Sequence, residues 1–313
     1  MRVFLTGVSG YLGSVVARRL AALPEIECIT GVDIVPPQAE LPEKVNFVQQ
    51  DVRSPDLAFT MAGHDVVIHT AFIVVWRARV PAAERDDINL NGTRNVARAA
   101  RSTSVSRIIH TSSVAAYGTI GSQPDPVTED FPLDQGSLSW YYTRGKVGAE
   151  RSLQEELDGS PILLTILRPT LIVGPGNRDT IPQLRANGIR IAGHDPIQQW
   201  VHEDDVAEAF AQAVLQELPG AYNVVPDDSI RMSETLRILG VTNPTPRPLW
   251  LARQVLGFRW RFLNYPTHPS WIDALWTFGN MNYSNAKLRA TGWRPRFSSA
   301  EALRDSVRSR PST

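Results

Sequence analysis

Short apolar runs alternate with amphipathic stretches through the first two-thirds of the chain. Each run is long enough for one buried strand, and the stretches between them repeat apolar positions at the spacing of a helix face. The pattern predicts strands at residues 3–5, 28–32, 66–69, 107–110 and 163–167, and helices at 11–23, 82–101 and 140–157. Strands and helices that alternate in this way form an α/β protein, with a doubly wound parallel sheet covered by helices on both faces.

The pattern changes beyond residue 175. A helical repeat covers residues 203–218 and an apolar run at 221–225 predicts one more strand, but the remainder lacks regular alternation. Five of the eight tryptophans lie after residue 225, at positions 250, 260, 271, 276 and 293. We predict a smaller, irregular C-terminal substrate lobe, made of residues 174–199 and 226–313. The sheet domain then comprises residues 1–173 and a return segment at about 200–225.

Composition and charge exclude several classes of protein. The 313 residues include 32 basic and 32 acidic side chains, and the formal net charge of zero argues against a nucleic-acid partner. No run of 18 apolar residues predicts a membrane span, and the N-terminus lacks the apolar segment of a signal peptide. The single cysteine, Cys28, cannot form an internal disulfide or a cysteine metal cluster, and it is expected in the core. We expect a cytoplasmic protein without a bound metal.

Three glycines follow the first predicted strand and open the first predicted helix. Glycine there permits a tight turn and lets backbone N–H groups approach a phosphate closely. The N-terminus of the helix adds N–H donors and a favourable dipole. This loop predicts that a dinucleotide pyrophosphate binds a Rossmann-type domain through Gly7, Ser9, Gly10, Tyr11, Leu12 and Gly13. The alternative interpretation is a glycine turn without a ligand.

Asp33 ends the second predicted strand, 26 residues after Gly7. An acidic side chain at this position can accept hydrogen bonds from the hydroxyls of the adenosine ribose. The same carboxylate repels a 2′-phosphate. The sequence therefore predicts NAD in preference to NADP.

Tyr142 and Lys146 lie four residues apart, on one face of a predicted helix. A tyrosine has an ordinary pKa of about 10, and a neighbouring ammonium group lowers it. Lysine occurs only three times in the chain, at Lys44, Lys146 and Lys287. A lysine beside this tyrosine therefore indicates a need for a compact ammonium, which binds ribose hydroxyls of the cofactor as well as tuning the phenol, and we expect both Tyr142 and Lys146 to contact the cofactor. We predict that Tyr142 is a general acid–base tuned by Lys146. The alternative is a surface pair that shares a helix face by chance.

Ser112 and Ser113 follow the strand predicted at 107–110, and ligands of doubly wound sheets bind beyond the carboxyl ends of the strands. A serine hydroxyl there can hold a substrate oxygen and share its proton with Tyr142. We assign Ser113 to catalysis and Ser112 to capping the strand end.

A second group of polar residues contains His202, Asp204 and Asp205, which are residue types that bind metals. Their helical spacing favours a structural role, and no third ligand is apparent in the sequence. We therefore expect these residues to anchor the small lobe to the sheet, and we assign no role to His110 or His194.

Taken in order, these motifs resemble those of the extended short-chain dehydrogenase/reductase family, which includes nucleotide-sugar epimerases and dehydratases. The resemblance covers almost the whole chain. It rests on residues 6–13, Asp51-Val52, residues 69–71, 89–93 and 111–118, the Tyr142/Lys146 pair, Arg168-Pro169, Gly174-Pro175, residues 200–207 and 222–224, and Gly292-Trp293.

The resemblance implies roles for further residues. It identifies Ser113, Tyr142 and Lys146 as a catalytic triad, with Asn89 in support. The remaining cofactor contacts that it implies are Asp51 and Val52 at the adenine, Thr70, Ala71 and Thr111 along the cofactor, and Pro169 and Thr170 at the carboxamide. Relatives form homodimers through the helices that correspond to 82–101 and 140–157, so a homodimer is expected here.

The chain departs from the nucleotide-sugar members at the positions that grip the substrate diphosphate. Leu171 stands where they carry an asparagine, and Gln198 and Gln199 stand where they carry an arginine. These changes remove charge-assisted hydrogen bonds, although arginines elsewhere in the lobe could replace them. Residues 69–73 and 167–170 instead resemble the hydroxysteroid dehydrogenase and dihydroflavonol reductase branch, whose substrates are apolar ketones and alcohols.

These observations predict an NAD-dependent oxidoreductase that moves a hydride between nicotinamide C4 and a small-molecule secondary alcohol or ketone. Phe72, Trp76, Trp140 and the aromatic residues at 250–278 are candidates for an apolar substrate pocket or for ordinary core packing. One alternative function is a nucleotide-sugar 4-epimerase or dehydratase that retains NAD. A second alternative is a non-catalytic regulator that binds NAD.

Overall fold

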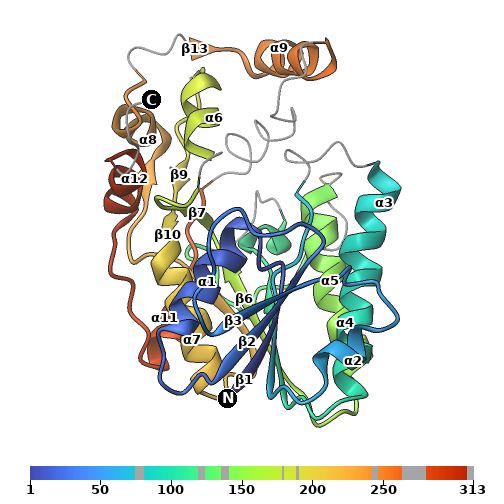
Figure 1. Ribbon diagram of the computed structural model, residues 1–313. Helices are drawn as coiled ribbons and strands as arrows, with labels where there is room; N and C mark the ends of the chain where they lie inside the picture. The colour runs from blue at the N-terminus through green and yellow to red at the C-terminus, as the bar shows by residue number, and fades with distance from the viewer. Residues whose placement is uncertain are drawn as a thin grey trace.

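The computed structural model describes residues 1–74, 81–118, 124–134, 141–177, 180–187, 190–241, 246–262 and 280–308. Within them, seven parallel strands form one sheet in the order β11-β6-β5-β4-β1-β2-β3 (Figure 1). The strands are β1 (Arg2–Thr6), β2 (Cys28–Asp33), β3 (Val45–Gln49), β4 (Val66–His69), β5 (Arg107–Thr111), β6 (Leu163–Pro169) and β11 (Gly220–Val224). The predicted doubly wound α/β fold is confirmed.

Helices cover both faces of this sheet (Figure 1). One face carries α1 (Tyr11–Ala21), α7 (Glu203–Leu215) and α11 (Ala286–Ala290), and the other carries α2 (Leu57–Met61), α4 (Gly92–Arg101) and α5 (Tyr141–Leu157), with α3 (Ala82–Asp86) beyond the end of α4. Val3 and Leu5 of β1 pack toward α1 and α7, while Phe4 between them packs toward α2, α4 and α5. Burial on both faces explains why the strands read as continuous apolar runs, since each fully buried side chain stabilises the fold by about 1.5–3 kcal/mol.

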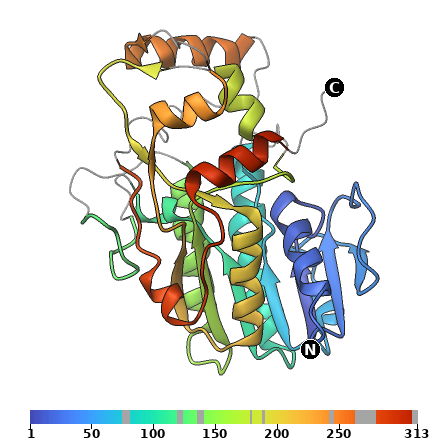
Figure 2. The same cartoon turned by 90° about the vertical axis from the view of Figure 1, so that its left-hand side faces the viewer.

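A second group of elements lies beyond the carboxyl edge of the sheet (Figures 1 and 2). Its short strands pair as β7 (Leu171–Val173) with β10 (Trp200–His202), β9 (Ile197–Gln198) with β12 (Ile230–Arg231), and β8 (Arg190–Ile191) with β13 (Pro246–Arg247). Its helices are α6 (Thr180–Asn187), α8 (Met232–Ile238), α9 (Leu249–Phe262) and α12 (Ser299–Arg308). The chain enters this group after β6, returns to the sheet with α7 and β11, and then leaves again. The predicted domain boundaries stay predictions.

The helix predicted at 82–101 is divided in the structure. A π-helical turn, η2 (Asp87–Asn91), separates α3 from α4. The reason is Asn89, whose side-chain amide hydrogen bonds to both backbone groups of Ile73, with Ile73 N–H donating at 2.8 Å and Asn89 donating to the carbonyl at 3.1 Å. Such bulges re-aim a side chain within a helix and are frequent at functional sites.

The sequence analysis missed β3 and α2. Strand β3 lies at the edge of the sheet with only Val45 fully buried, and α2 is a single helical turn, so neither shows a strong periodic pattern. The expectation that Cys28 lies in the core is wrong, because its side chain is half-buried at the start of β2. No helix in the described part of the chain is long and apolar enough to cross a membrane.

Candidate active site

The predicted site residues converge on the carboxyl edge of the sheet. β1 lies between β2 and β4, so the order of strands reverses there, and open α/β sheets bind ligands at such a point. The glycine loop follows β1, Asp33 ends β2, Thr70 and Ala71 follow β4, Thr111 ends β5 ahead of Ser113, and Thr170 follows Pro169 at the end of β6.

The glycine loop is packed too closely for side chains. Gly7 has a φ of +77°, and a Cβ added to it would lie 2.8 Å from the Ala71 nitrogen. A Cβ on Gly13 would lie 2.0 Å from the carbonyl oxygen of Gly7. Gly10 caps α1 without a side-chain hydrogen bond, and the first turn of α1 has no acidic residue. A tight cradle below an uncapped helix N-terminus fits a pyrophosphate.

Asp33 lies beside this loop. Its carboxylate accepts hydrogen bonds from the backbone N–H groups of Ser9, at 3.1 Å, and Val35, at 3.2 Å. The side chain is half-buried at the end of β2. A carboxylate held in this place fits the hydroxyls of an adenosine ribose.

Asp51 and Val52, which the resemblance places at the adenine, lie beyond the end of β3. Asp51 binds Arg53, with 2.6 Å between the Oδ2 and Nη2 atoms, and the hydrogen bonds from Arg53 lower the pKa of the carboxyl. Val52 is buried in the core between the sheet and α4. In this structure the Asp51 carboxylate is therefore paired with Arg53, and Arg53 also forms an ion pair with Asp87.

The residues after β4 are tied to the end of β1. The Thr70 hydroxyl donates to the carbonyl of Thr6 at 2.7 Å, and the N–H of Ala71 donates to the Thr6 hydroxyl at 3.3 Å. These bonds hold Thr70 and Ala71 against the glycine loop, where both lie close to Gly7. Asn89 completes the arrangement by fixing Ile73, so the structure gives Asn89 a positioning contact with the backbone.

Ser113 and Tyr142 meet at the centre of the candidate site. Their side chains share a hydrogen bond, and burial raises the pKa of Tyr142 to about 12 while the Ser113 contact opposes the increase. The sequence predicted that Lys146 lowers the pKa of Tyr142. In the structure this pKa is raised instead, because removal of water from the phenol is the larger effect. Tyr142 therefore holds its proton at neutral pH in the ligand-free protein.

The structure reverses part of the expectation for the two serines. Ser113 caps a short 3₁₀ turn, η3 (Val114–Tyr117), by accepting from the Ala115 N–H at 3.2 Å. Ser112, which was expected to be the capping residue, instead donates its hydroxyl proton to the buried carboxylate of Glu150. The cap fixes the backbone of Ser113 beside Tyr142.

Lys146 is buried one helical turn from Tyr142. Its ammonium donates to the carbonyl of Thr111 at 2.9 Å and lies 3.7 Å from the centroid of the Phe72 ring. Burial lowers the pKa of Lys146 to about 7, and the charge of Glu150 opposes that decrease. The Phe72 ring also meets the Tyr142 ring edge-on, with 5.8 Å between centroids, so this aromatic side chain excludes water from both groups.

Two buried histidines lie behind the candidate site. His69 and His110 stack with 5.3 Å between ring centroids, and His69 hydrogen bonds to the hydroxyls of Thr6 and Thr93. Burial lowers the pKa of His69 to about 3, and burial followed by the charge of His69 lowers the pKa of His110 as well. Both rings are therefore neutral at physiological pH.

The positions that depart from the nucleotide-sugar pattern have structural contacts here. Gln199 is buried, and its side-chain amide forms two hydrogen bonds with the backbone of Tyr283. It donates to the Tyr283 carbonyl at 3.2 Å and accepts from the Tyr283 N–H at 2.8 Å. Gln198 is also fully buried, and Leu171 packs against the core of the second group of elements. Of the predicted pocket aromatics, Trp250 is 65% exposed on α9, and Trp76, Trp140 and residues 263–278 lie outside the described residues.

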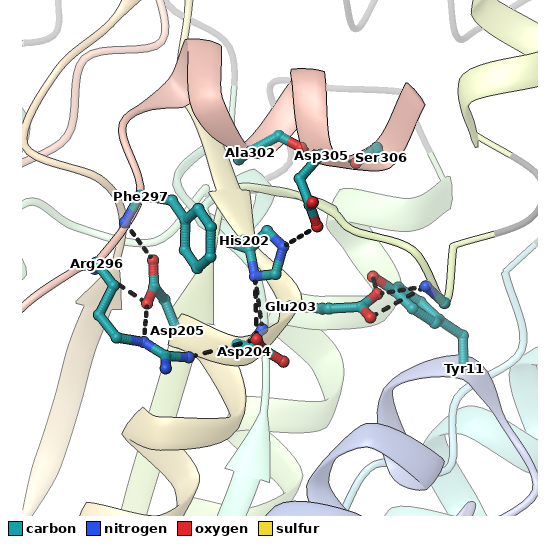
Figure 3. Close-up of polar contacts among 11 residues, drawn as sticks. Tyr11, His202, Glu203, Asp204, Asp205, Arg296, Phe297, Ala302, Asp305 and Ser306 are labelled. Atoms are coloured by element: carbon teal, nitrogen blue, oxygen red, sulfur yellow. Dashed lines mark hydrogen bonds and ion pairs between the residues drawn. The ribbon is translucent and has the colours of Figure 1, made fainter. Parts of the chain in front are cut away.

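A carboxylate that the sequence analysis missed joins the glycine loop to the second group of elements (Figure 3). Glu203, at the start of α7, accepts a hydrogen bond from the Tyr11 hydroxyl at 2.5 Å. It also accepts from the N–H of Gly176 at 3.0 Å. Because Tyr11 begins α1 directly after the glycine loop and Gly176 follows β7, the contact fixes these two segments against each other.

The contacts of His202 and Asp205 agree with the predicted anchoring role (Figure 3). The Nε2 atom of His202 lies 3.2 Å from the Oδ2 atom of Asp305 in α12, and the His202 ring stacks on Phe297 with 3.9 Å between ring centroids. Asp205 accepts from the backbone N–H groups of Arg296 and Phe297. Within the described residues, no three His, Cys, Asp or Glu side chains gather as a metal site.

Comparison with known proteins adds the family context. Residues 3–224 match the model of a family described as "NAD dependent epimerase/dehydratase family". The short-chain dehydrogenase/reductase family 42E member 1 of Xenopus laevis is 31% identical over 235 residues, which cover 69% of this chain and 59% of that protein. The decarboxylating sterol-4-alpha-carboxylate 3-dehydrogenase of Candida albicans is 26% identical over 273 residues, covering 81% and 73%.

A solved structure shares the fold over the full length of the chain. The UDP-glucose 4-epimerase of Thermotoga maritima, determined with UDP-glucose, superposes with a TM-score of 0.78. The alignment covers 98% of this chain and 97% of the epimerase at 18% identity. At that identity the match speaks for the fold alone.

Proposed function

Because this chain belongs to the NAD dependent epimerase/dehydratase family, we propose that it is an oxidoreductase that transfers a hydride between NAD and an apolar secondary alcohol or ketone. The observation that carries the proposal is the meeting of Ser113, Tyr142 and Lys146 at the carboxyl edge of the sheet. The Ser113 and Tyr142 side chains share a hydrogen bond, and Lys146 lies one helical turn away. Lys146 is buried and Tyr142 is half-buried, and the loss of water around them strengthens their electrostatic interactions.

The cofactor site is proposed along the loop after β1. Backbone N–H groups from Gly7 to Gly13 would hold the pyrophosphate, and Asp33 would hold the adenosine ribose. A carboxylate in that position disfavours the 2′-phosphate of NADP, so NAD is the proposed cofactor. When bound, NAD supplies a nicotinamide C4 that gives or accepts the hydride.

The residues of this chain supply the proton chemistry. In carbonyl reduction, Ser113 would donate a hydrogen bond to the substrate oxygen and Tyr142 would transfer its proton to that oxygen while the carbonyl carbon gains the hydride. A pKa of about 12 makes Tyr142 a proton donor in the ligand-free protein. In alcohol oxidation the Tyr142 phenolate would accept the proton of the substrate hydroxyl, and a protonated Lys146 would stabilise that phenolate before the transfer.

The apolar substrate class is favoured over a nucleotide sugar. Gln199 is committed to Tyr283, and Leu171 packs in a hydrophobic core, so neither offers a hydrogen-bond donor to a diphosphate. The Phe72 ring presents an apolar surface beside Tyr142. The relative from Candida albicans is named as a 3-dehydrogenase of a sterol-4-alpha-carboxylate, and that name supports an apolar alcohol as the substrate class.

The experiment compares the two classes on one preparation. Purified protein is denatured and the released nicotinamide is measured, and native protein is then assayed for NADH formation with sterol-like and aliphatic secondary alcohols. We expect little retained cofactor and steady NADH formation with an apolar alcohol. Retained NAD together with interconversion of UDP-sugars without net NADH would contradict the proposal, and NAD binding without any turnover would favour a regulator.

A further inference from the structure

Helix α5 carries a row of three polar side chains on one face. Tyr142, Lys146 and Glu150 follow one another at intervals of four residues. The first two belong to the proposed catalytic triad, whereas neither the sequence analysis nor the resemblance gave Glu150 a role. Its side chain is fully buried. A buried carboxylate is costly unless it is paired, so its surroundings require an explanation.

Glu150 is bound from two other elements of the site. Arg168, in β6, donates from Nε at 3.0 Å and from Nη2 at 2.6 Å, one bond to each carboxylate oxygen. Ser112, which follows β5, donates its hydroxyl proton to the same carboxylate. The residues next to these two partners are Ser113 and Pro169. Glu150 thus ties the two strand ends of the site to the helix that carries Tyr142.

The arginine is itself held on its other side. Arg168 donates from Nη1 to the Tyr117 hydroxyl at 2.9 Å, and that hydroxyl donates to Asn223 at 2.7 Å. Burial acts against the charge of Arg168, but the hydrogen bonds and the charge of Glu150 outweigh it and raise its pKa. Arg168 is therefore a permanent cation in the same buried region as Lys146.

The other groups that face Lys146 do not offset this second cation. His69 at the end of β4 and His110 in β5 are neutral, because burial lowers the pKa of each. Tyr142 holds its proton, and Phe72 contributes only the face of its ring. Of the groups named here together with Arg168, Glu150 is the one that carries a negative charge.

Burial and the charge of Glu150 set the protonation of Lys146. Burial lowers the pKa of Lys146 to about 7, and the Glu150 charge is the influence that opposes it. Lys146 is then about half protonated at neutral pH. Without the carboxylate, burial and the unpaired Arg168 would both favour the neutral amine.

We propose that Glu150 is a positioning residue of the site, whose carboxylate favours the protonated form of Lys146 and fixes the Ser113 and Pro169 strand ends against α5. The alternative is an ion pair with Arg168 that only stabilises the fold. The consequence for catalysis rests on the proposed function, whereas the coupling of charge between Glu150 and Lys146 does not.

The small number of lysines makes this coupling measurable without a substrate. Protein grown with [¹³Cε]lysine has three labelled side chains, and Lys44→Arg and Lys287→Arg assign them by elimination. The carbon shift of Lys146 is followed from pH 5 to 11 in the full chain. We expect a midpoint near 7 in the wild-type protein. Glu150→Gln should lower the midpoint by about one pH unit or more.

A second variant predicts a change of opposite sign. Arg168→Gln removes the competing cation and leaves the Glu150 charge to act on Lys146, so the midpoint should rise. Glu155→Gln makes the same chemical change at an exposed position on α5 and should leave the midpoint in place. Loss of fold stability alone would not move the Lys146 signal in opposite directions in the two charge variants.

The outcomes separate the inference from the proposed function. A wild-type midpoint near the ordinary lysine value of about 10.4, or an unchanged midpoint in folded Glu150→Gln, would overturn the role of Glu150. If Glu150→Gln does not fold, a midpoint in Arg168→Gln that rises supports the coupling, and one that stays or falls overturns it. With an active substrate, Glu150→Gln should also move the alkaline limb of carbonyl reduction to lower pH. The expected shift of the Lys146 signal in a protein without turnover would contradict the proposed function alone.

Discussion

The cofactor half and the acid–base half of the candidate site consist of different kinds of chemical group. The cofactor half, at the end of β1, consists of backbone groups packed so closely that Gly7 and Gly13 leave no room for a Cβ. The acid–base half, between β5 and α5, consists of buried side chains whose protonation is set by the loss of water and by neighbouring charges. The first half depends on shape and the second depends on charge.

This difference decides how each half fails. A substitution in the glycine loop displaces backbone and should weaken cofactor binding, with little effect on the chemistry of whatever cofactor still binds. A substitution in the row Tyr142, Lys146 and Glu150 changes proton affinity and should reduce turnover while leaving cofactor binding in place. Variants of Tyr142 and Gly13 each disturb one half of the site and leave the other half as an internal control.

Tyr142→Phe should have the largest effect. It removes the proton donor but keeps the ring that meets Phe72, so the packing is preserved. We expect turnover to fall by about 10²–10⁴-fold, the usual contribution of a positioned acid, with NAD affinity within a few-fold of the wild-type value. Steady-state kinetics and an NAD titration measure the two quantities.

The neighbouring tyrosine is a matched control for this variant. Tyr141 lies on the same helix and packs under Arg85, with 4.4 Å between the guanidinium carbon and the ring centroid. Tyr141→Phe should leave turnover within a few-fold of the wild-type value. Equal losses in the two variants, or full activity in Tyr142→Phe, would remove Tyr142 from the mechanism.

Gly13→Ala should have the next largest effect, on the cofactor half. The added methyl group would lie 2.0 Å from the Gly7 oxygen, so the loop must open. We expect NAD affinity to fall roughly 100-fold, equivalent to about 3 kcal/mol, while turnover at saturating NAD falls far less. Gly257→Ala, within α9 where an added Cβ has no neighbour within 4 Å, is the control. Unchanged NAD affinity in Gly13→Ala would place the cofactor elsewhere.

Asp33→Asn should have a smaller effect, on the choice of cofactor. The amide keeps the size of the side chain but removes the charge that repels a 2′-phosphate. We expect NAD affinity to fall by about tenfold, consistent with loss of one charged hydrogen bond, and the preference for NAD over NADP to narrow. Asp158→Asn, at an exposed position, should change neither. A wild-type protein that prefers NADP would contradict the role assigned to Asp33.

The buried histidines should produce the smallest effect, on stability. Their folded pKa values are lowered, to about 3 for His69, whereas an unfolded histidine titrates near 6.5. The unfolded chain therefore binds protons first as the pH falls below about 6.5. The free energy of unfolding should decrease by up to about 1.4 kcal/mol per pH unit for each histidine.

Urea unfolding at pH 7, 6 and 5 measures this slope. His110→Gln should reduce it, because one of the two neutral buried rings is removed, and His194→Gln at an exposed position should not. A slope that is the same in wild type and His110→Gln would show that His110 titrates normally.

The same division explains what could be predicted from the sequence. The strands, the glycine loop, Asp33 and the Tyr142/Lys146 spacing are local patterns, so the doubly wound fold and the meeting of Ser113 with Tyr142 follow from them. The contacts of Glu150 with Arg168 join residues 18 positions apart on different elements. The bond between Tyr11 and Glu203 spans 192 positions.

Burial produced the other differences from expectation. The pKa of Tyr142 rises because water is removed from the phenol, which a spacing of four residues does not reveal. Ser112 binds Glu150 instead of capping the strand end, and that contact depends on where Glu150 lies in the fold. The edge strand β3 could not be predicted from the hydrophobic pattern, because only one of its five side chains is buried.

Net transfer of hydride to a released product is the central claim, and isotope labelling tests it most directly. The protein is incubated with an apolar ketone and NADH that carries deuterium at C4 on the transferred face, and the products are analysed by mass spectrometry. We expect deuterium on the carbinol carbon of the released alcohol, in a one-to-one ratio with the NADH consumed. Deuterium that stays on the cofactor, with UDP-sugars epimerised and no NADH consumed, would contradict it.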